Sequence, residues 1–182
     1  MGLDDILADL GIVFVVTVAG IYAIGYMLKP DHISKTRAII NKSPHVLFDY
    51  LLDFPKWPRW NKEVPKPERK MDQNGHMVWE LGDHLVEIVE INKPMGPNPG
   101  HFILRVANPK SPFQGTWTWV FEQEGGASKV TIIEQGKVES PLWRFLAKFL
   151  FGHNATAKTY LHMLGQHYEQ GQDFKTEELP VD

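Results

Sequence analysis

Cysteine is absent from this chain of 182 residues. Disulfides, thiolate metal sites and a cysteine nucleophile are therefore excluded, and the composition is compatible with a reducing compartment. The HExxH, GxSxG and P-loop motifs of hydrolases and nucleotide-binding proteins are also missing. His162 and His167 are five residues apart, so they do not share a helix face as two metal ligands would. We predict no metal, no cofactor and no catalytic residue, and we favour a binding protein over an enzyme.

Charge is missing between Leu10 and Leu28, in the run LGIVFVVTVAGIYAIGYML. As a helix, its 19 residues reach roughly 28 Å at ~1.5 Å per residue, close to the ~30 Å hydrocarbon core of a bilayer. A buried core helix and a secretory signal peptide are the alternatives. The acidic start of the chain and the lack of a small-residue cleavage site after Met27 argue against a signal peptide. We therefore predict a single-pass membrane anchor with its flank over residues 1–31.

The charges around this segment predict its orientation. The N-terminal tail has no Lys or Arg, whereas Lys29, Lys35 and Arg37 follow the apolar run. The positive-inside rule then places the following domain in the cytoplasm. Four of the 22 acidic and one of the 19 basic residues lie in residues 1–31, which leaves 18 of each in the rest of the chain. A domain of zero net charge without a Lys/Arg run gives no footprint for nucleic acid.

From His32 onward the sequence predicts one domain, 32–170, followed by a polar tail over 171–182. HISKTRAIIN, residues 32–41, alternates in the manner of a strand. Further strands are predicted at HMVWEL (76–81), HLVEIVEIN (84–92), HFILRVA (101–107), TWTWVFEQ (116–123) and KVTIIEQGKV (129–138). The last two pair across the turn Gly125–Gly126, so we expect an antiparallel meander.

Two helices complete the pattern. Ser43 and Pro44 form an N-cap and a proline at the first position of a short helix, which runs into the aromatic, proline-rich elbow DFPKWPRWN at 53–61. A long helix is predicted from Pro141 to about Glu169. Its stripe at helical spacing consists of Phe145, Phe149, Gly152, Thr156, Tyr160 and Leu164. Glycine inside a helix costs up to ~1 kcal/mol relative to alanine, so Gly152 either kinks this helix or allows close packing. If the first helix and the elbow hold the long helix off the sheet, an enclosed apolar space remains between them.

Three stretches carry a family resemblance: INKSPHVLFDYLLDFPKWPRWNKEV, the hairpin GTWTWVFEQEGGASKVTI, and SPLWRFLAKFLF at the start of the last helix. Together they resemble the START-like superfamily, which includes Bet v 1-like proteins and the polyketide cyclase/dehydrase and lipid-transport (SRPBCC) domains. The resemblance covers residues 33–169. It implies an α+β helix-grip fold, in which an antiparallel sheet wraps around a long C-terminal helix. In such a fold the elbow plugs one end of a cavity, with Trp57 or Trp60 as the plug.

The resemblance implies a cavity for a hydrophobic ligand rather than a particular chemistry. We expect membrane-anchored binding or transport of a lipid, sterol, isoprenoid or quinone-like molecule. Two alternatives stay open: a polyketide cyclase or dehydratase-type enzyme that uses Glu87 or His101, and an interaction module whose PLWRFLAKFLF segment lies on a membrane or partner. Glu87 and Arg105 either anchor a ligand headgroup or point to solvent, and we favour solvent. The expected ligand-contacting residues are Trp57, Trp60, Trp79, Phe102, Leu104, Trp117, Trp119, Phe145, Phe149, Thr156 and Tyr160.

Overall fold

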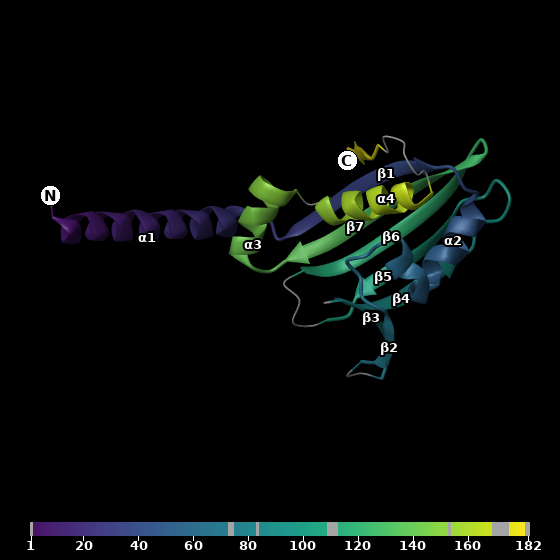
Figure 1. Cartoon of the computed structure of the whole chain (residues 1–182), viewed down its shortest axis with the longest axis horizontal. Helices are drawn as coiled ribbons and strands as arrows, with labels where there is room; N and C mark the ends of the chain where they lie inside the picture. Colours follow the sequence, from purple (N-terminus) through teal and green to yellow (C-terminus); the bar gives the residue numbers. More distant parts are fainter. Residues whose placement is uncertain are drawn as a thin grey trace.

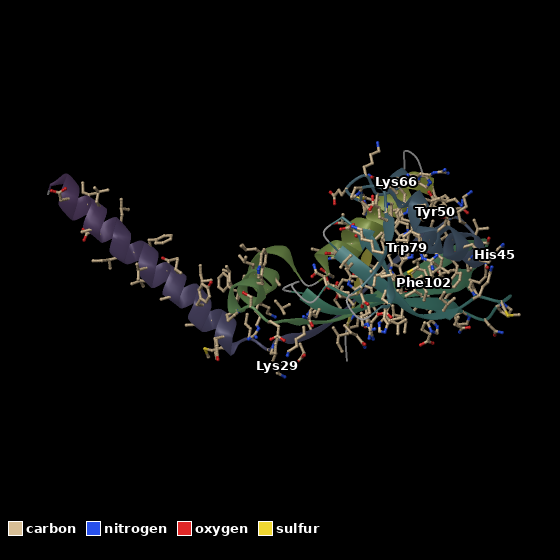
Figure 2. All side chains as sticks on the ribbon, turned by 90° about the horizontal axis from the view of Figure 1, so that it is seen from below. Lys29, His45, Tyr50, Lys66, Trp79 and Phe102 are labelled. Carbon is tan, nitrogen blue, oxygen red and sulfur yellow. The ribbon has the colours of Figure 1, made fainter. Side chains whose placement is uncertain are left out.

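The structure is a computed structural model, and it describes residues 2–72, 75–82, 84–108, 113–152, 154–168 and 175–180. An N-terminal helix, α1 (Leu3–Met27), projects away from an α+β body in which one sheet curves around the C-terminal helices (Figure 1). Lys29 lies at the junction between α1 and this body (Figure 2). The predicted α+β architecture is confirmed.

Within the described residues the sheet has eight strands in the order β2-β3-β4-β5-β6-β7-β1-β8, and every neighbouring pair is antiparallel. Their bounds are β1 Asp31–Ile40, β2 Glu68–Met71, β3 Met77–Leu81, β4 His84–Asn92, β5 Gly100–Val106, β6 Phe113–Glu124, β7 Ala127–Val138 and β8 Glu177–Leu179. All six predicted strands are present. The sequence pattern does not predict β2 or β8, because their residues are mostly charged and lack an apolar alternation.

Strand β1 closes the sheet by pairing with β7 along its whole length, from Asp31 opposite Lys137 to Ile40 opposite Ser128. The hairpin between β6 and β7 turns at Gly125, whose φ of +59° suits glycine, and this confirms the predicted two-residue turn. Strand β8, which lies within the predicted polar tail, pairs with the other edge of β1.

The first helix and the elbow cover one end of the sheet's inner face. Helix α2 (Pro44–Leu52) starts at the predicted proline, and a 3₁₀ turn, η1 (Phe54–Arg59), forms the elbow. The side chain of Trp57 is fully buried there, and its Nε1 donates a hydrogen bond to the carbonyl oxygen of Leu51 at 2.8 Å. The elbow therefore anchors itself to the end of the helix that precedes it.

The C-terminal helix is interrupted, which differs from the continuous helix predicted from Pro141. It consists of α3 (Pro141–Leu146), a π-helical turn η2 (Ala147–Phe151) and α4 (Ala155–Tyr168). Gly152 ends the π turn with φ +79° and ψ 150°, a conformation open mainly to glycine. The 3.6-residue periodicity continues through this point, so the pattern alone does not reveal the break. Glu169, the expected last residue, lies outside the described residues.

Aromatic side chains fill the interior beneath α2 and η1. The fully buried large side chains include Trp57, Trp119, Phe48, Phe54, Phe102 and Phe121. Most of their rings meet edge to face or tilted, as between Phe48 and Phe121, whose centroids are 5.5 Å apart, whereas Phe102 and Trp119 are stacked. Figure 2 shows Phe102 and Trp79 inside the body beside α2. We call this region the packed end of the interior.

Candidate ligand cavity

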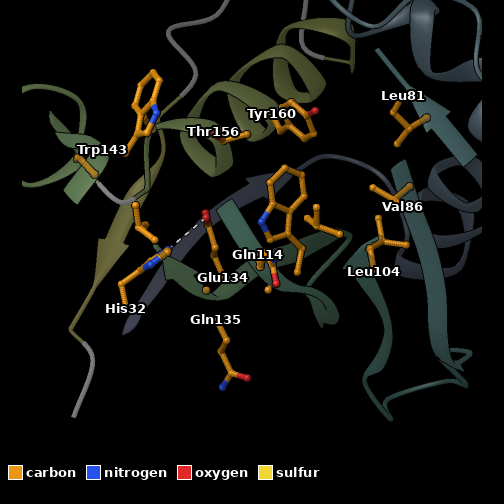
Figure 3. A pocket seen from close by; sticks show the side chains of 18 residues that line it. His32, Leu81, Val86, Leu104, Gln114, Glu134, Gln135, Trp143, Thr156 and Tyr160 are labelled. Carbon is orange, nitrogen blue, oxygen red and sulfur yellow. Dashed lines mark hydrogen bonds and ion pairs between the residues drawn. The ribbon is translucent and has the colours of Figure 1, made fainter. Parts of the chain in front are cut away.

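A cavity of about 350 Å³ occupies the other end of the interior, between the sheet and the segment α3–η2–α4 (Figure 3). We call this region the cavity end. The sheet contributes the apolar side chains of Leu81, Val86, Leu104, Val106, Trp117 and Val138, and the helical side contributes those of Trp143, Ala147, Ala155 and Tyr160. The wall is therefore mostly apolar, and the polar side chains on it are those of His32, Gln114, Glu134, Gln135 and Thr156, together with the hydroxyl group of Tyr160.

Two glycines line this cavity on the sheet side and let neighbouring groups approach closely there. Gly115 of β6 pairs with Gly136 of β7, so two positions that face each other across the strands carry no side chain. Gly136 lies against the imidazole of His32, where a β-carbon would be only 3.0 Å from Nε2. Gly115 has a φ of +153°, and a β-carbon there would collide with the backbone of Gln135. Larger residues at these two positions would fill the space or displace its walls.

Two polar side chains meet at one side of the cavity. His32 of β1 and Glu134 of β7 lie diagonally across the strand pair, because His32 is opposite Gly136 and Glu134 is opposite Ser34. The distance from His32 Nε2 to Glu134 Oε1 is 3.3 Å, and the side chains are only 9% and 16% exposed (Figure 3). Buried ionisable groups are usually paired, and these two residues satisfy that rule through each other.

Four of the residues predicted to contact a ligand line this cavity: Leu104, Trp117, Thr156 and Tyr160. Trp57, Trp60, Phe102 and Trp119 are instead buried in the packed end, and Trp79 packs against that core. Phe145 and Phe149 contact each other with ring centroids 4.9 Å apart, and Phe149 is 56% exposed. The sequence places the rings of the sheet and the elbow on the inner face, but it does not distinguish a filled region from an open one, and the outward position of Phe149 differs from the prediction.

Tyr160 marks the boundary between the two ends. Its ring packs edge to face on Trp57, Trp60 and Trp117 at centroid distances of 5.5–5.8 Å, and the residue also lines the cavity. Burial, together with the charge of Glu63, raises the pKa of the Tyr160 hydroxyl to about 12. Tyr160 therefore stays neutral at physiological pH and adds no charge to the cavity wall.

The charged residues singled out from the sequence lie away from the cavity. Arg105 forms an ion pair with Glu87, which it faces across strands β5 and β4. His101 pairs in the same way with Glu90, at 2.9 Å between Nε2 and Oε1. None of the four lines the cavity, and both pairs are accessible to solvent. Pairs of this kind on a sheet surface contribute little to binding or stability.

Sequence reasoning missed the pair that does line the cavity. In β7 the inward positions alternate as Val130, Ile132, Glu134, Gly136 and Val138, so an acid and a glycine interrupt an apolar series. That interruption is the signal available in the sequence. His32 gives no comparable signal, because the residues that follow it on the same face of β1 are Ser34 and Thr36, and a polar series of that kind also suits a solvent-facing strand.

The sheet, the elbow and the cavity together define a helix-grip domain with an internal apolar pocket. The chain belongs to the polyketide cyclase / dehydrase and lipid transport family, whose family model matches residues 32–159. Among curated proteins, none matches the sequence. The family resemblance predicted from the three sequence stretches is therefore confirmed.

Solved structures share the fold. The lipid transfer and protein localization domain of human StarD13 matches with a TM-score of 0.58 at 12% identity, covering 78% of this chain and 79% of that one. The protein jhp0584 of Helicobacter pylori matches with a TM-score of 0.55 at 15% identity, covering 75% of this chain and 88% of that one. CalU16 of Micromonospora echinospora gives 0.50 at 11% identity, covering 75% and 78%. These likenesses confirm the helix-grip fold.

Proposed function

We propose that the protein binds or carries a hydrophobic small molecule in the cavity while α1 anchors it to a membrane. The observation that carries the proposal is the cavity itself. Its volume of about 350 Å³ falls in the range of roughly 300–1,000 Å³ typical of small-molecule sites. Burial of an apolar ligand contributes about 0.8 kcal/mol for each methylene group removed from water, so an alkyl or polycyclic ligand gains most from such a wall.

The support for membrane anchoring is α1. Within the described part of the chain, one helix is long and apolar enough to span a membrane: Ile6–Met27, 22 residues with a mean hydropathy of 2.2. None of its most hydrophobic window is buried against the rest of the protein. A helix of 22 residues spans roughly 33 Å, which matches the hydrocarbon core. A bilayer is the environment that would remove this apolar surface from water.

The second support is the position of α3 beside the end of α1 (Figure 1). Gly25 of α1 packs directly on the backbone of Pro141, and the guanidinium of Arg144 donates to the carbonyl oxygens of Leu28 and Val138. Trp143, from the same helix, lines the cavity. An anchor in this position would hold the cavity end toward the bilayer, where an apolar ligand resides.

The exposed side chains that continue from α3 fit the same arrangement. Phe149 and Leu150 on η2 are 56% and 66% exposed, and Trp143 is 38% exposed. Large apolar groups that stay in water are unfavourable, and aromatic rings are comfortable at the membrane interface. With Lys29, Lys35 and Arg37 following α1, the positive-inside rule favours the cytoplasmic side for the domain. A domain on the cytoplasmic side should be protected from a protease that is added outside intact cells.

The binding proposal is tested by identifying what the full chain retains. The protein is purified in mild detergent, its apolar molecules are extracted and mass spectrometry identifies them. Thr156→Leu places a larger side chain in the cavity, whereas Thr159→Leu makes the same change at an exposed α4 position that does not line it. We expect one enriched molecule in the wild type and in Thr159→Leu, and much less of it in Thr156→Leu. Only bulk membrane lipid in all three samples would contradict the proposal.

Anchoring has a separate test. The full chain should stay with membranes after alkaline carbonate extraction, whereas a chain that begins at Lys29 should be soluble. Lys29 is a better boundary than His32, because the carbonyl oxygen of Pro30 accepts a hydrogen bond from the backbone of Val138 at 2.8 Å. Release of the full chain by carbonate would show that α1 does not span the bilayer.

A cyclase or dehydratase-type enzyme is the second candidate, and one observation favours it. An imidazole and a carboxyl group in contact at the wall of an apolar cavity, as in His32 and Glu134, can transfer protons to and from a bound substrate. The two functions differ in turnover. If the co-purified molecule is recovered unchanged after prolonged incubation with the protein, binding is favoured, and conversion that His32→Gln abolishes would favour the enzyme.

A further inference from the structure

His32 and Glu134 form one polar side of the cavity, and the two carboxyl oxygens of Glu134 differ in their hydrogen bonding. The carboxyl group of Glu134 uses one oxygen, Oε1, to contact His32 Nε2 at 3.3 Å. The other oxygen, Oε2, is buried and has no hydrogen-bond partner among the described residues. A carboxylate accepts hydrogen bonds and does not donate them, so the imidazole nitrogen is the donor in the existing contact. The unused capacity at this side of the cavity is that of an acceptor.

The charge of the lining excludes one class of ligand headgroup. Among the described residues that line the cavity there is neither Lys nor Arg, and the acidic residue is Glu134. A ligand carboxylate or phosphate placed there would meet a second negative charge in a region of low dielectric constant, and the described lining residues supply no Lys or Arg to offset it. An ammonium group would bring three donors to the one free oxygen of Glu134, and the other two donors would need the side-chain oxygens of Gln114, Gln135 or Thr156. A hydroxyl group brings one donor, which matches.

We propose that Glu134, held in place by His32, is the recognition site for the hydroxyl group of an uncharged amphipathic ligand, a long-chain or polycyclic alcohol. The inference rests on the proposed binding function and names the class of molecule that the cavity takes. The ligand hydroxyl donates to Glu134, and the apolar part lies against Leu104, Trp117 and Val86. His32 is a positioning residue, because its ring contacts the carboxyl group and rests on Gly136.

The backbone supports this assignment of roles. Gly136 has no side chain, and a β-carbon there would displace the imidazole that lies over it. The pairing of β1 with β7 then sets the imidazole and the carboxyl group side by side. Glu134 consequently approaches the cavity in a defined orientation, which lowers the entropic cost of recognising a small group such as a hydroxyl.

Three photoaffinity probes with the same alkyl chain and the same diazirine test the proposal: hexadecanol, its methyl ether and hexadecanoate. The full chain is placed in phosphatidylcholine nanodiscs, irradiated with each probe, and the labelled residues are mapped by mass spectrometry. The ether keeps the oxygen and removes the donor, so the wild type alone tests the donor requirement. We expect labelling of cavity residues by the alcohol to exceed labelling by the ether and by the carboxylate about tenfold, the effect of losing one hydrogen bond to a charged acceptor.

Glu134→Gln tests the residue, since it keeps the shape of the side chain and removes its charge. We expect this variant to bring the labelling by hexadecanoate to within about threefold of that by hexadecanol, because the repulsion is gone and the amide can donate. Glu122→Gln is the matched control: Glu122 pairs with Lys129 on the opposite face of the sheet, and the wild-type preference should persist.

The outcomes distinguish a failure of the proposed hydroxyl site from a failure of the proposed binding function. Equal labelling of the cavity by all three probes in the wild type would overturn the hydroxyl site and leave the binding function standing. A preference for the alcohol that Glu134→Gln leaves unchanged would assign the hydroxyl to another residue and overturn the role of Glu134. No labelling of cavity residues by any probe, with no apolar molecule co-purifying, would overturn the binding function itself.

Discussion

The packed end and the cavity end of the interior are built from the same strands. In β6, Trp119 and Phe121 are fully buried under α2 and the elbow, whereas Gly115 and the half-buried Trp117 border the cavity. In β7, Val130 and Ile132 lie in the core, whereas Glu134 and Gly136 line the cavity. The sheet itself does not distinguish the ends. The residues on its inner face, and the helices that cover them, do.

The helical layer repeats the difference. The packed end is covered by α2 and η1, which bring Phe48, Phe54 and Trp57 into the core. The cavity end is covered by α3, η2 and the first turns of α4, with the helix break at Gly152 between η2 and α4. Close packing leaves few voids in protein interiors, so a space of about 350 Å³ bordered by glycines and a helix break is a feature of the sequence rather than a packing defect.

The largest expected effect is at the packed end. Trp119→Ala removes a fully buried ring that is stacked on Phe102 with centroids 5.8 Å apart. We expect the free energy of unfolding to fall by about 3–5 kcal/mol, because the transfer energy of the ring is lost and a cavity remains. Chemical denaturation of the purified protein measures this change. A loss below about 1 kcal/mol would mean that the packed end tolerates empty space and does not differ from the cavity end in its packing.

A smaller effect is expected where the sheet borders the cavity. Gly136→Ala places a β-carbon against the ring of His32 and 3.2 Å from the carbonyl oxygen of Gln114. Overpacking of this kind typically costs about 1–3 kcal/mol, and the imidazole should move away from Glu134. Gly126→Ala is the control, because no atom lies within 4 Å of its added carbon. Equal stability of the two variants would show that the close approach at Gly136 is not required.

The sequence predicts the fold well where apolar periodicity and turn chemistry agree. Strands β3 to β7, the proline start of α2 and the turn at Gly125 all follow from local signals. Strands β2 and β8 do not, since charged segments pair with a sheet edge through their backbones and through ion pairs such as Arg37 with Glu177. At Gly152 the sequence leaves a kink and close packing open and does not decide between them, because one glycine is tolerated within a helical pattern.

The site is less predictable than the fold for a physical reason. An inward-facing aromatic residue looks the same in the sequence whether a neighbouring ring or an empty space lies opposite. Trp117 and Trp119 are two positions apart on one strand, yet Trp117 lines the cavity and Trp119 is in the core. The cavity depends on contacts between residues far apart in the sequence. Gly136 contacts His32, which is 104 positions away, and no local sequence pattern predicts that contact.

Thr156→Leu should change the free energy of unfolding less than Trp119→Ala or Gly136→Ala does. Thr156 is exposed and lines the cavity, so the larger side chain extends into open space and meets no packed wall. We expect the free energy of unfolding of the ligand-free protein to change by no more than about 0.5 kcal/mol, as at most surface positions. A loss comparable to that of Gly136→Ala, measured by the same denaturation, would mean that helix and sheet are packed shut at Thr156.

The smallest effect is a pH dependence of the free energy of unfolding that comes from His167, which contacts Tyr50 at the rim of the packed end. The ring of His167 stacks on the ring of Tyr50, and the Tyr50 hydroxyl lies 3.2 Å from Nε2 of His167. Burial lowers the pKa of His167 below its ordinary value of 6.5, and the charge of Arg59 lowers this pKa further. The folded state therefore favours the neutral imidazole. The corresponding stability is fully present above pH 6.5 and is lost as the pH falls through the lower pKa of the folded protein.

His167→Gln should remove this dependence. The side chain still reaches Tyr50 but does not titrate, so the fall in the free energy of unfolding between pH 7 and pH 5 should be shallower than in the wild type. His45→Gln, at an exposed position on α2, should keep the wild-type slope. Denaturant titrations at several pH values measure the slopes. If His167→Gln and the wild type lose stability in parallel, the imidazole is as free to protonate in the folded protein as in the unfolded chain, and the rim of the packed end is open to water.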